Sequence, residues 1–213
     1  MLTIHHLGIS QSDRAVWLCE ELEIPYALVR YERDPVTRMA PPEYRALHPS
    51  GTAPVIADGD LILAESGAVI EYIIHRHGGG RFALPPSDPS YPDYLFWFHF
   101  ANGSLMPANM SVSVANRLGG GDGDPVAANV QGRLDRGWSM IEDRLGRVPY
   151  FAGEAFTAAD IISLFPLTTM RAFAPRDISP YPNVRAYLRR IAARPAFVRA
   201  MAKADPDFRI PLD

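Results

Sequence analysis

The residue pattern changes sharply near residue 80, and this change constrains the fold more than any other feature of the 213-residue chain. Before it, short apolar runs alternate with amphipathic segments. After it, apolar residues recur only at helical spacing. The segment Gly78–Pro89 is dense in Gly and Pro and cannot continue either pattern. We therefore expect an α/β domain over residues 1–80, a linker over 81–90 and an all-helical domain over 91–213.

The first half has the pattern of a βαβ unit followed by ββα. Strands are expected over residues 2–7, 26–31, 54–57 and 61–63, and helices over 11–22 and 66–77. Asp58-Gly59-Asp60 is a turn signal that makes the last two strands a hairpin. Gly78 stands where a left-handed cap of the second helix is expected.

The second half contains no credible strand. Helical stretches are expected over residues 91–118, 125–145, 157–173, 183–193 and 195–204. Pro107 should kink or interrupt the first of these, because it lacks the N–H that the preceding turn would bond. Residues 119–124, rich in Gly and Asp, predict a flexible loop. The run Thr157-Ala158-Ala159-Asp160 fits a capping box, which we interpret as structural.

Composition narrows the classes of protein. The formal net charge is -3, with both signs mixed along the chain, which argues against a nucleic-acid or anionic-membrane partner. Cys19 is the one cysteine, so no disulfide can form within the chain and a reducing compartment is expected. The N-terminus lacks the pattern of a signal peptide, and no apolar run is long enough to span a membrane. We expect a cytoplasmic protein.

Four motifs in order along the chain resemble those of cytosolic glutathione transferases. They are Ser10–Val16, His48–Ile56, the pair Glu65-Ser66, and Thr157–Ile161. The resemblance covers essentially the whole chain, and the segment His99–Pro107 is similar to the serine-type bacterial and fungal Gtt-like branch. It implies a thioredoxin-like domain that binds glutathione, an all-α domain that contributes the pocket for an electrophile, and a role in detoxification.

The chemistry of such an enzyme requires modest stabilisation of a thiolate. A free thiol has a pKa near ~8.5, and lowering it by two units needs about 3 kcal/mol of preference for the thiolate. A hydroxyl donor and the positive end of a helix can supply this. By the resemblance, Ser10 lies where serine-type members keep the activating hydroxyl, with Ser12 as the second candidate. From spacing alone, Ser10-Gln11-Ser12-Asp13 also fits a capping box, so either serine could instead cap the helix.

The glutathione-binding residues implied by the resemblance are Thr52, Ala53, Pro54, Glu65 and Ser66. Pro54 matches a proline that is normally cis, which would turn the backbone of Ala53 outward to pair with glutathione. Glu65 and Ser66 match the pair that holds the γ-glutamyl end. The alternatives are a proline at a strand start and an ordinary helix cap. The sequence does not reveal the isomer of the bond before Pro54.

The chain departs from the family at Thr52, where many relatives have a lysine that contacts the glycyl carboxylate of glutathione. His48, Arg38 or Arg14 could replace that charge, although surface roles are favoured for these three. The affinity for glutathione is therefore an open question at this position.

The residues of the electrophile pocket are the part of the site that the sequence predicts least clearly. The residues Asn102, Met106, Asn109 and Met110 recur near helical spacing and are our candidates, because methionine suits an adaptable pocket. A core role is the alternative for such a stripe. The electrophile itself is not identified. By the resemblance, we expect a homodimer.

Other chemistries are disfavoured. Cys19 shares the apolar side of its helix, and no C-x-x-C motif is present, which argues against a disulfide-exchanging enzyme. His5 and His6 alternate faces of a strand, and His75 and His77 lie two apart on a helix, so no metal site is expected.

The sequence thus predicts an enzyme that activates glutathione for attack on a hydrophobic electrophile or for reduction of an organic hydroperoxide. Two alternatives remain open. One is a non-catalytic module that binds glutathione or a partner. The other is a glutathione-dependent disulfide reductase.

Overall fold

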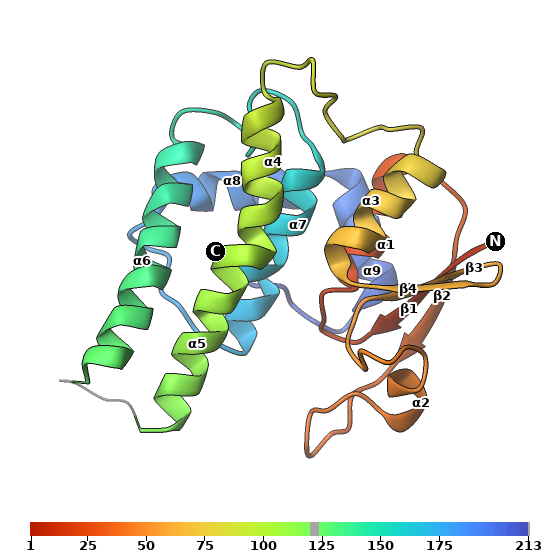
Figure 1. The fold of residues 1–213 in the computed structure, drawn as a ribbon, viewed down its shortest axis with the longest axis horizontal. Helices are drawn as coiled ribbons and strands as arrows, with labels where there is room; N and C mark the ends of the chain where they lie inside the picture. The colour runs from red at the N-terminus through yellow and green to blue at the C-terminus, as the bar shows by residue number, and fades with distance from the viewer. Residues whose placement is uncertain (120–123, 213) are drawn as a thin grey trace. The chain divides into compact units, whose positions relative to one another are not determined.

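The computed structural model describes residues 1–119 and 124–212, and its internal contacts divide them into two units (Figure 1). The first unit comprises Met1–Ala83 together with Ile191–Ile210, and the second is built on Leu84–Arg190. This grouping differs from the expected one, which placed all of residues 91–213 in the helical domain. The reason is the last helix, α9 (Pro195–Ala204), which packs against the first helix, α1 (Asp13–Leu22).

The first unit is built on a mixed sheet with the strand order β2-β1-β3-β4. The strands are β1 (Leu2–Leu7), β2 (Ala27–Tyr31), β3 (Val55–Asp58) and β4 (Leu61–Ala64). β1 pairs parallel with β2 and antiparallel with β3, and β3 pairs antiparallel with β4. The thioredoxin-like arrangement expected from the sequence is therefore confirmed.

The two faces of the sheet are covered by different helices (Figure 1). On one side lie α1 and α3 (Ser66–Arg76), and β1 turns Leu2, Ile4 and His6 to one face by the two-residue period of a strand. On the other side lies α2 (Pro42–Arg45), whose Tyr44 packs in a cluster with Leu7. The sequence did not predict α2, because four residues are too few to show a helical period.

Contacts between α1 and α9 explain why the chain's last helix belongs to the first unit. The ring of Trp17 meets that of Phe197 edge-on at 5.2 Å. Glu21 accepts two hydrogen bonds from Arg194, at 2.6 and 2.7 Å. Glu20 accepts from two further basic side chains of α9. Packing and paired charges thus join segments at opposite ends of the sequence.

Gly78 does not adopt the left-handed conformation that the sequence predicted for it. That conformation occurs at Gly79 and Gly80, with φ of 61° and 81°. A Cβ atom on Gly78 would lie 2.9 Å from the backbone carbonyl oxygen of Ile74 and 2.9 Å from the side chain of Leu22, so the last turn of α3 and the end of α1 together favour glycine here.

The second unit is helical in the part that the structure describes. Its α-helices are α4 (Tyr91–Phe100), α5 (Met106–Arg117), α6 (Pro125–Leu145), α7 (Ala158–Leu167) and α8 (Pro182–Ala192). The first predicted stretch is interrupted by a π-helical turn over Ala101–Leu105, just before Pro107, whose ring and missing N–H disturb the preceding turn. The predicted stretch 157–173 ends in a separate 3₁₀ turn, Thr169–Ala172. Most of the predicted loop, residues 120–123, lies outside the described residues.

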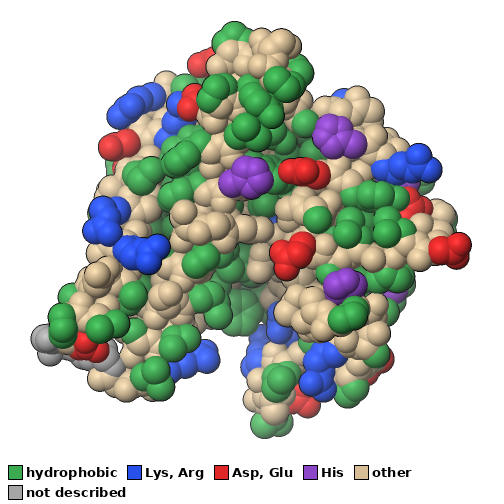
Figure 2. Space-filling view, in the orientation of Figure 1, with side chains coloured by type: hydrophobic (Ala, Val, Ile, Leu, Met, Phe, Trp, Pro, Cys, Tyr) green, Lys and Arg blue, Asp and Glu red, His purple; other side chains and the backbone are tan. Residues whose placement is uncertain are grey.

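The surface carries charges of both signs. Figure 2 shows basic and acidic side chains interspersed over the face in view, in keeping with the mixed composition. Among the helices of the described residues, none combines the length and apolar character needed to cross a membrane.

Asp160 organises the core of the second unit. The predicted capping box at Thr157 is present. The buried carboxylate of Asp160 also accepts from the backbone N–H of Phe151 at 2.9 Å and of Thr157 at 2.8 Å. Burial raises the pKa of Asp160 to about 6, against the lowering effect of these hydrogen bonds. The carboxylate therefore joins the start of α7 to the segment before it.

We predict that Asp160→Ala destabilises the protein by about 2 to 4 kcal/mol, because it leaves buried N–H groups without acceptors. Urea unfolding followed by circular dichroism measures this loss. The matched control is Asp124→Ala at the N-cap of α6, where an exposed carboxylate accepts from Val126 N–H. The control should cost about 1 kcal/mol. Equal losses for the two variants would contradict the role given to burial.

Candidate functional site

The loop after β1 places both candidate serines in a buried hydrogen-bond network. Ser10 is 4% exposed and Ser12 is fully buried. The Ser10 hydroxyl donates to the carbonyl of Leu7 at 2.6 Å and lies 2.7 Å from the Ser12 hydroxyl. Ser12 is the N-cap residue of α1, yet its side chain makes no cap hydrogen bond. The capping alternative is therefore wrong for Ser12. The Ser10 hydroxyl accepts from the backbone N–H of Ser12 at 3.3 Å, a contact of the capping kind, and also bonds to β1 and to the Ser12 hydroxyl.

A histidine and an aspartate extend this network. The ring of His6 lies with Nδ1 2.8 Å from the Ser12 hydroxyl and Nε2 3.1 Å from a carboxylate oxygen of Asp205. The side chain of His6 is fully buried and that of Asp205 is 9% exposed. Asp205 follows the last turn of α9, so the end of the chain reaches the loop that carries the serines.

The loop itself is held in a constrained conformation. Ile9 has a φ of 51°, which is unfavourable for a β-branched residue. Its N–H donates to Asp205 at 3.0 Å. Arg33 donates to the carbonyls of Gly8 at 2.8 Å and Ile9 at 3.2 Å. Residues outside the loop therefore impose the backbone that precedes Ser10.

Arg14 connects this loop to the start of α3. One guanidinium nitrogen donates to Gln11 at 2.5 Å and to the Ser66 hydroxyl at 2.9 Å. Arg14 is 1% exposed, so the surface role favoured for it from the sequence is wrong. Burial lowers the pKa of Arg14 to about 10, and burial raises the pKa of the neighbouring Asp13 to about 7. The structure thus brings Ser66 close to the serine loop.

The remaining predicted glutathione residues lie directly before β3 and directly after β4. The Ala53–Pro54 peptide bond is cis, which answers the question that the sequence left open. Thr52 and Glu65 are exposed, and Pro54 and Ser66 are buried. Glu65, the N-cap residue of α3, has a φ of 73° and makes no side-chain cap bond. A residue with a side chain seldom adopts this conformation outside functional sites.

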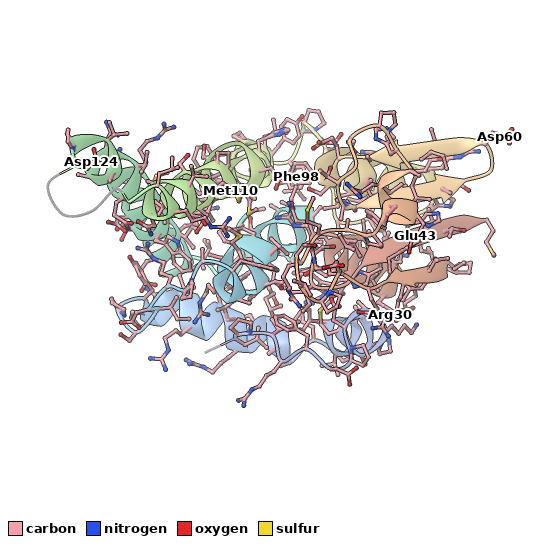
Figure 3. All side chains as sticks on the ribbon, turned by 90° about the horizontal axis from the view of Figure 1, so that it is seen from below. Arg30, Glu43, Asp60, Phe98, Met110 and Asp124 are labelled. Carbon is pink, nitrogen blue, oxygen red and sulfur yellow. The ribbon has the colours of Figure 1, made fainter. Side chains whose placement is uncertain are left out.

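The four candidates for the electrophile pocket differ in exposure. Met110, on α5, is 51% exposed (Figure 3), and Asn102 and Met106 are half-buried. Asn109 is 4% exposed, and its amide donates to the carbonyl of Leu105 at 3.0 Å. Asn109 also lines a cavity of about 520 Å³ between α5, α6 and residues 173–177.

Cys19 is fully buried, as the sequence predicted, and burial raises the pKa of its thiol. Within residues 1–119 and 124–212, no cluster of three or more His, Cys, Asp or Glu side chains could hold a metal ion.

Comparison with known proteins identifies the family. The models of the glutathione S-transferase N-terminal and C-terminal domains match residues 10–76 and 124–190. The chain is 33% identical to glutathione S-transferase 3 of Schizosaccharomyces pombe, over 96% of this chain and 88% of the relative. The chain belongs to the glutathione S-transferase family.

Other relatives agree with this assignment. Glutathione S-transferase 1 of Saccharomyces cerevisiae is 26% identical, over 96% of this chain and 95% of its own length. The crystal structure of a glutathione S-transferase from Actinobacillus pleuropneumoniae is 33% identical and superposes with a TM-score of 0.88, covering 98% of this chain and 97% of that one. The predicted family, fold and enzyme class are confirmed, with glutathione as the family's co-substrate.

Sequence reasoning missed His6 and Asp205. A signal for His6 was present, since it shares a strand face with Leu2 and Ile4, and a buried imidazole needs hydrogen-bond partners. Asp205 carried no local signal, because 199 residues separate it from His6.

We predict that Glu65→Gly stabilises the free protein by about 1 kcal/mol. Relief of about 1 to 3 kcal/mol of backbone strain exceeds the entropic cost of glycine, about 0.5 to 1 kcal/mol. Urea unfolding measures the change, with Glu65→Gln, which keeps the constrained backbone, as the control. A less stable Glu65→Gly variant would show that the carboxylate stabilises the fold by more than its conformation costs.

Proposed function

We propose that this transferase stabilises glutathione as a thiolate with the hydroxyl of Ser10, for attack on a hydrophobic electrophile or reduction of an organic hydroperoxide. The observation that carries the proposal is the placement of Ser10 at the end of a hydrogen-bonded chain in a constrained loop. Ser12 remains the second candidate. Ser12 is fully buried and its hydroxyl contacts His6, so Ser10 is favoured as the residue that contacts the sulfur.

The energetic requirement suits a single hydroxyl. Ser10 precedes α1, and the positive end of a helix together with one O–H donor favours a thiolate by a few kcal/mol. In the free protein, the Ser10 hydroxyl donates to the Leu7 carbonyl. On binding glutathione, it would turn this proton to the sulfur.

Glutathione would bind along the first unit. The backbone of Ala53, next to the cis bond to Pro54, would pair with the peptide as an added strand. The Ser66 hydroxyl and the first amides of α3 would hold the γ-glutamyl carboxylate, and Glu65 its ammonium group. Arg14, bonded to Ser66, supports this assignment by fixing that hydroxyl beside the serine loop.

The electrophile would contact Asn102, Met106, Asn109 and Met110. The exposure of Met110 supports this role, because a flexible thioether adapts to varied apolar substrates. We further propose a homodimer acting in cytoplasmic detoxification, in line with a family whose members are typically dimeric.

Ser10→Ala should raise the pKa of bound glutathione and slow turnover by roughly tenfold to a hundredfold, because a lost donor to an anion costs about 1.5 to 3 kcal/mol. The ultraviolet difference spectrum of bound glutathione against pH reports the thiolate directly. Glutathione affinity should stay near that of the wild type. An unchanged spectrum would move the role to Ser12 or to backbone amides, and an unshifted thiol in the wild type would refute activation altogether.

Thr52→Lys should tighten glutathione binding by up to about fivefold, because an exposed ion pair with the glycyl carboxylate contributes about 0.2 to 1 kcal/mol. Calorimetric titration at low and high salt measures the gain. Thr52→Gln is the uncharged control. A gain that persists in high salt, or that Gln reproduces, would speak against a charge effect.

A further inference from the structure

Four short contacts form one continuous chain from a backbone carbonyl to a carboxylate. The carbonyl of Leu7 lies 2.6 Å from the Ser10 hydroxyl, which lies 2.7 Å from the Ser12 hydroxyl. The Ser12 hydroxyl lies 2.8 Å from Nδ1 of His6, and Nε2 of His6 lies 3.1 Å from Asp205. Each contact has hydrogen-bond length and therefore holds one proton.

The direction of every bond follows from the carbonyl end. A carbonyl oxygen can only accept a hydrogen bond, so Ser10 donates its one hydroxyl proton to the carbonyl of Leu7. The Ser12 hydroxyl accepts from the N–H of Leu7 at 3.2 Å and lies 3.4 Å from the Leu7 carbonyl. Its much shorter contact is with Ser10, so we assign its proton to Ser10, which has already used its own. Nδ1 of His6 must in turn donate to Ser12.

The contact between His6 and Asp205 locates the second proton of the ring. An ionised carboxylate only accepts, so Nε2 of His6 donates to Asp205. Burial acts to raise the pKa of Asp205, but hydrogen bonds from His6 and Ile9, with the charges of His6 and Arg30, leave it lowered. Four contacts therefore use two hydroxyl protons and two ring protons.

We propose that His6 is a buried imidazolium that positions Ser12 and, through it, the hydroxyl of Ser10. The inference deepens the proposed function, because it rests on Ser10 as the thiol-activating group. With His6 charged, Ser10 accepts from Ser12 and keeps its own proton free to turn from Leu7 to the thiolate. With His6 neutral at Nδ1, Ser12 donates to the ring and Ser10 donates to Ser12, so Ser10 must give up its bond to Ser12 before it can donate to the thiolate.

The charged groups around the ring come from three elements. From the end of α9, Asp205 meets the ring directly. From α1, Asp13 has an electrostatic interaction with His6, and burial raises the pKa of Asp13 to about 7, so its negative charge develops around neutrality. From β2, Arg30, which is labelled in Figure 3, pairs in register with His6. Arg30 also has an electrostatic interaction with Asp205. Arg14 of α1 also acts on Asp13, and Arg33, in the segment after β2, also acts on Asp205, so three guanidinium groups interact with the two carboxyl groups near the ring.

The direct test is the ¹⁵N spectrum of the free protein labelled at histidine, since an imidazolium and the two neutral tautomers give distinct nitrogen shifts. At pH 7 we expect protons on both nitrogens of His6. The signal that disappears in both His6→Asn and His6→Gln assigns the residue. A neutral ring with Nδ1 unprotonated would overturn the proposal, whatever Ser10→Ala does to the thiolate.

The second test distinguishes the role of Nδ1 of His6 from that of Nε2. The amide of Asn can replace Nδ1 as donor to Ser12, whereas the amide of Gln reaches the place of Nε2 and leaves Ser12 without a donor. We expect His6→Asn to keep the glutathione thiolate within about threefold of the wild-type fraction at pH 7, and His6→Gln to lose it as far as Ser10→Ala does. A wild-type thiolate fraction in His6→Gln would overturn the proposal.

A matched control is available in the same unit. His77, at the C-terminal end of α3, also pairs with an aspartate: its Nε2 lies 2.7 Å from Asp58 of β3, outside the serine loop. His77→Asn should leave the thiolate unchanged. If Ser10→Ala leaves the thiolate unchanged while His6 is an imidazolium, the thiol-activating role of Ser10 fails and the proton assignment stands.

Discussion

The carboxylate of Asp205 is the interaction on which the candidate site depends most. It accepts from the His6 ring and from the N–H of Ile9, the residue with the left-handed conformation before Ser10. Asp205 caps the C-terminal end of α9, where the helix dipole disfavours a negative charge. The two donors offset that cost, so the site and the end of the helix stabilise one another. Without the two donors, the negative charge of Asp205 at the end of α9 would be unfavourable. Without Asp205, the His6 ring and the N–H of Ile9 would lose their acceptor.

Helix α1 carries buried charge that a purely structural helix would avoid. Burial raises the pKa of Asp13 to about 7 and lowers that of Arg14 to about 10, so both groups weaken the fold in their charged forms. For Asp13, the folded protein binds more protons than the unfolded chain between about pH 4 and 7. Its contribution to stability therefore falls as the pH rises through that window. Arg14 is placed by this helix to hold Ser66, which explains why a buried cation is retained.

The sequence predicted the elements that follow from local patterns. All four strands and the long helix over residues 125–145 emerged from periodicity, and the capping box at Thr157 emerged from spacing. Local patterns did not predict that α9 belongs to the first unit. That grouping depends on contacts of Glu20, Glu21 and Trp17 with residues about 180 positions later in the chain. The same limit applies to the site. Ser10 stood out by its place after β1, whereas its connection to Asp205 exists only in three dimensions.

The first unit is built from two separate segments of the chain, and this affects how the site assembles. The first unit needs residues 191–210 for the face of α1 that receives α9 and for the carboxylate that holds His6 and Ile9. Contacts of such large sequence separation form late, because closing the intervening loop costs entropy before the contacts compensate for it. The sheet and its local helices can form earlier from neighbouring segments. The constrained conformation of the loop that carries Ser10 therefore depends on the docking of α9, which brings Asp205 to the N–H of Ile9 and to the ring of His6.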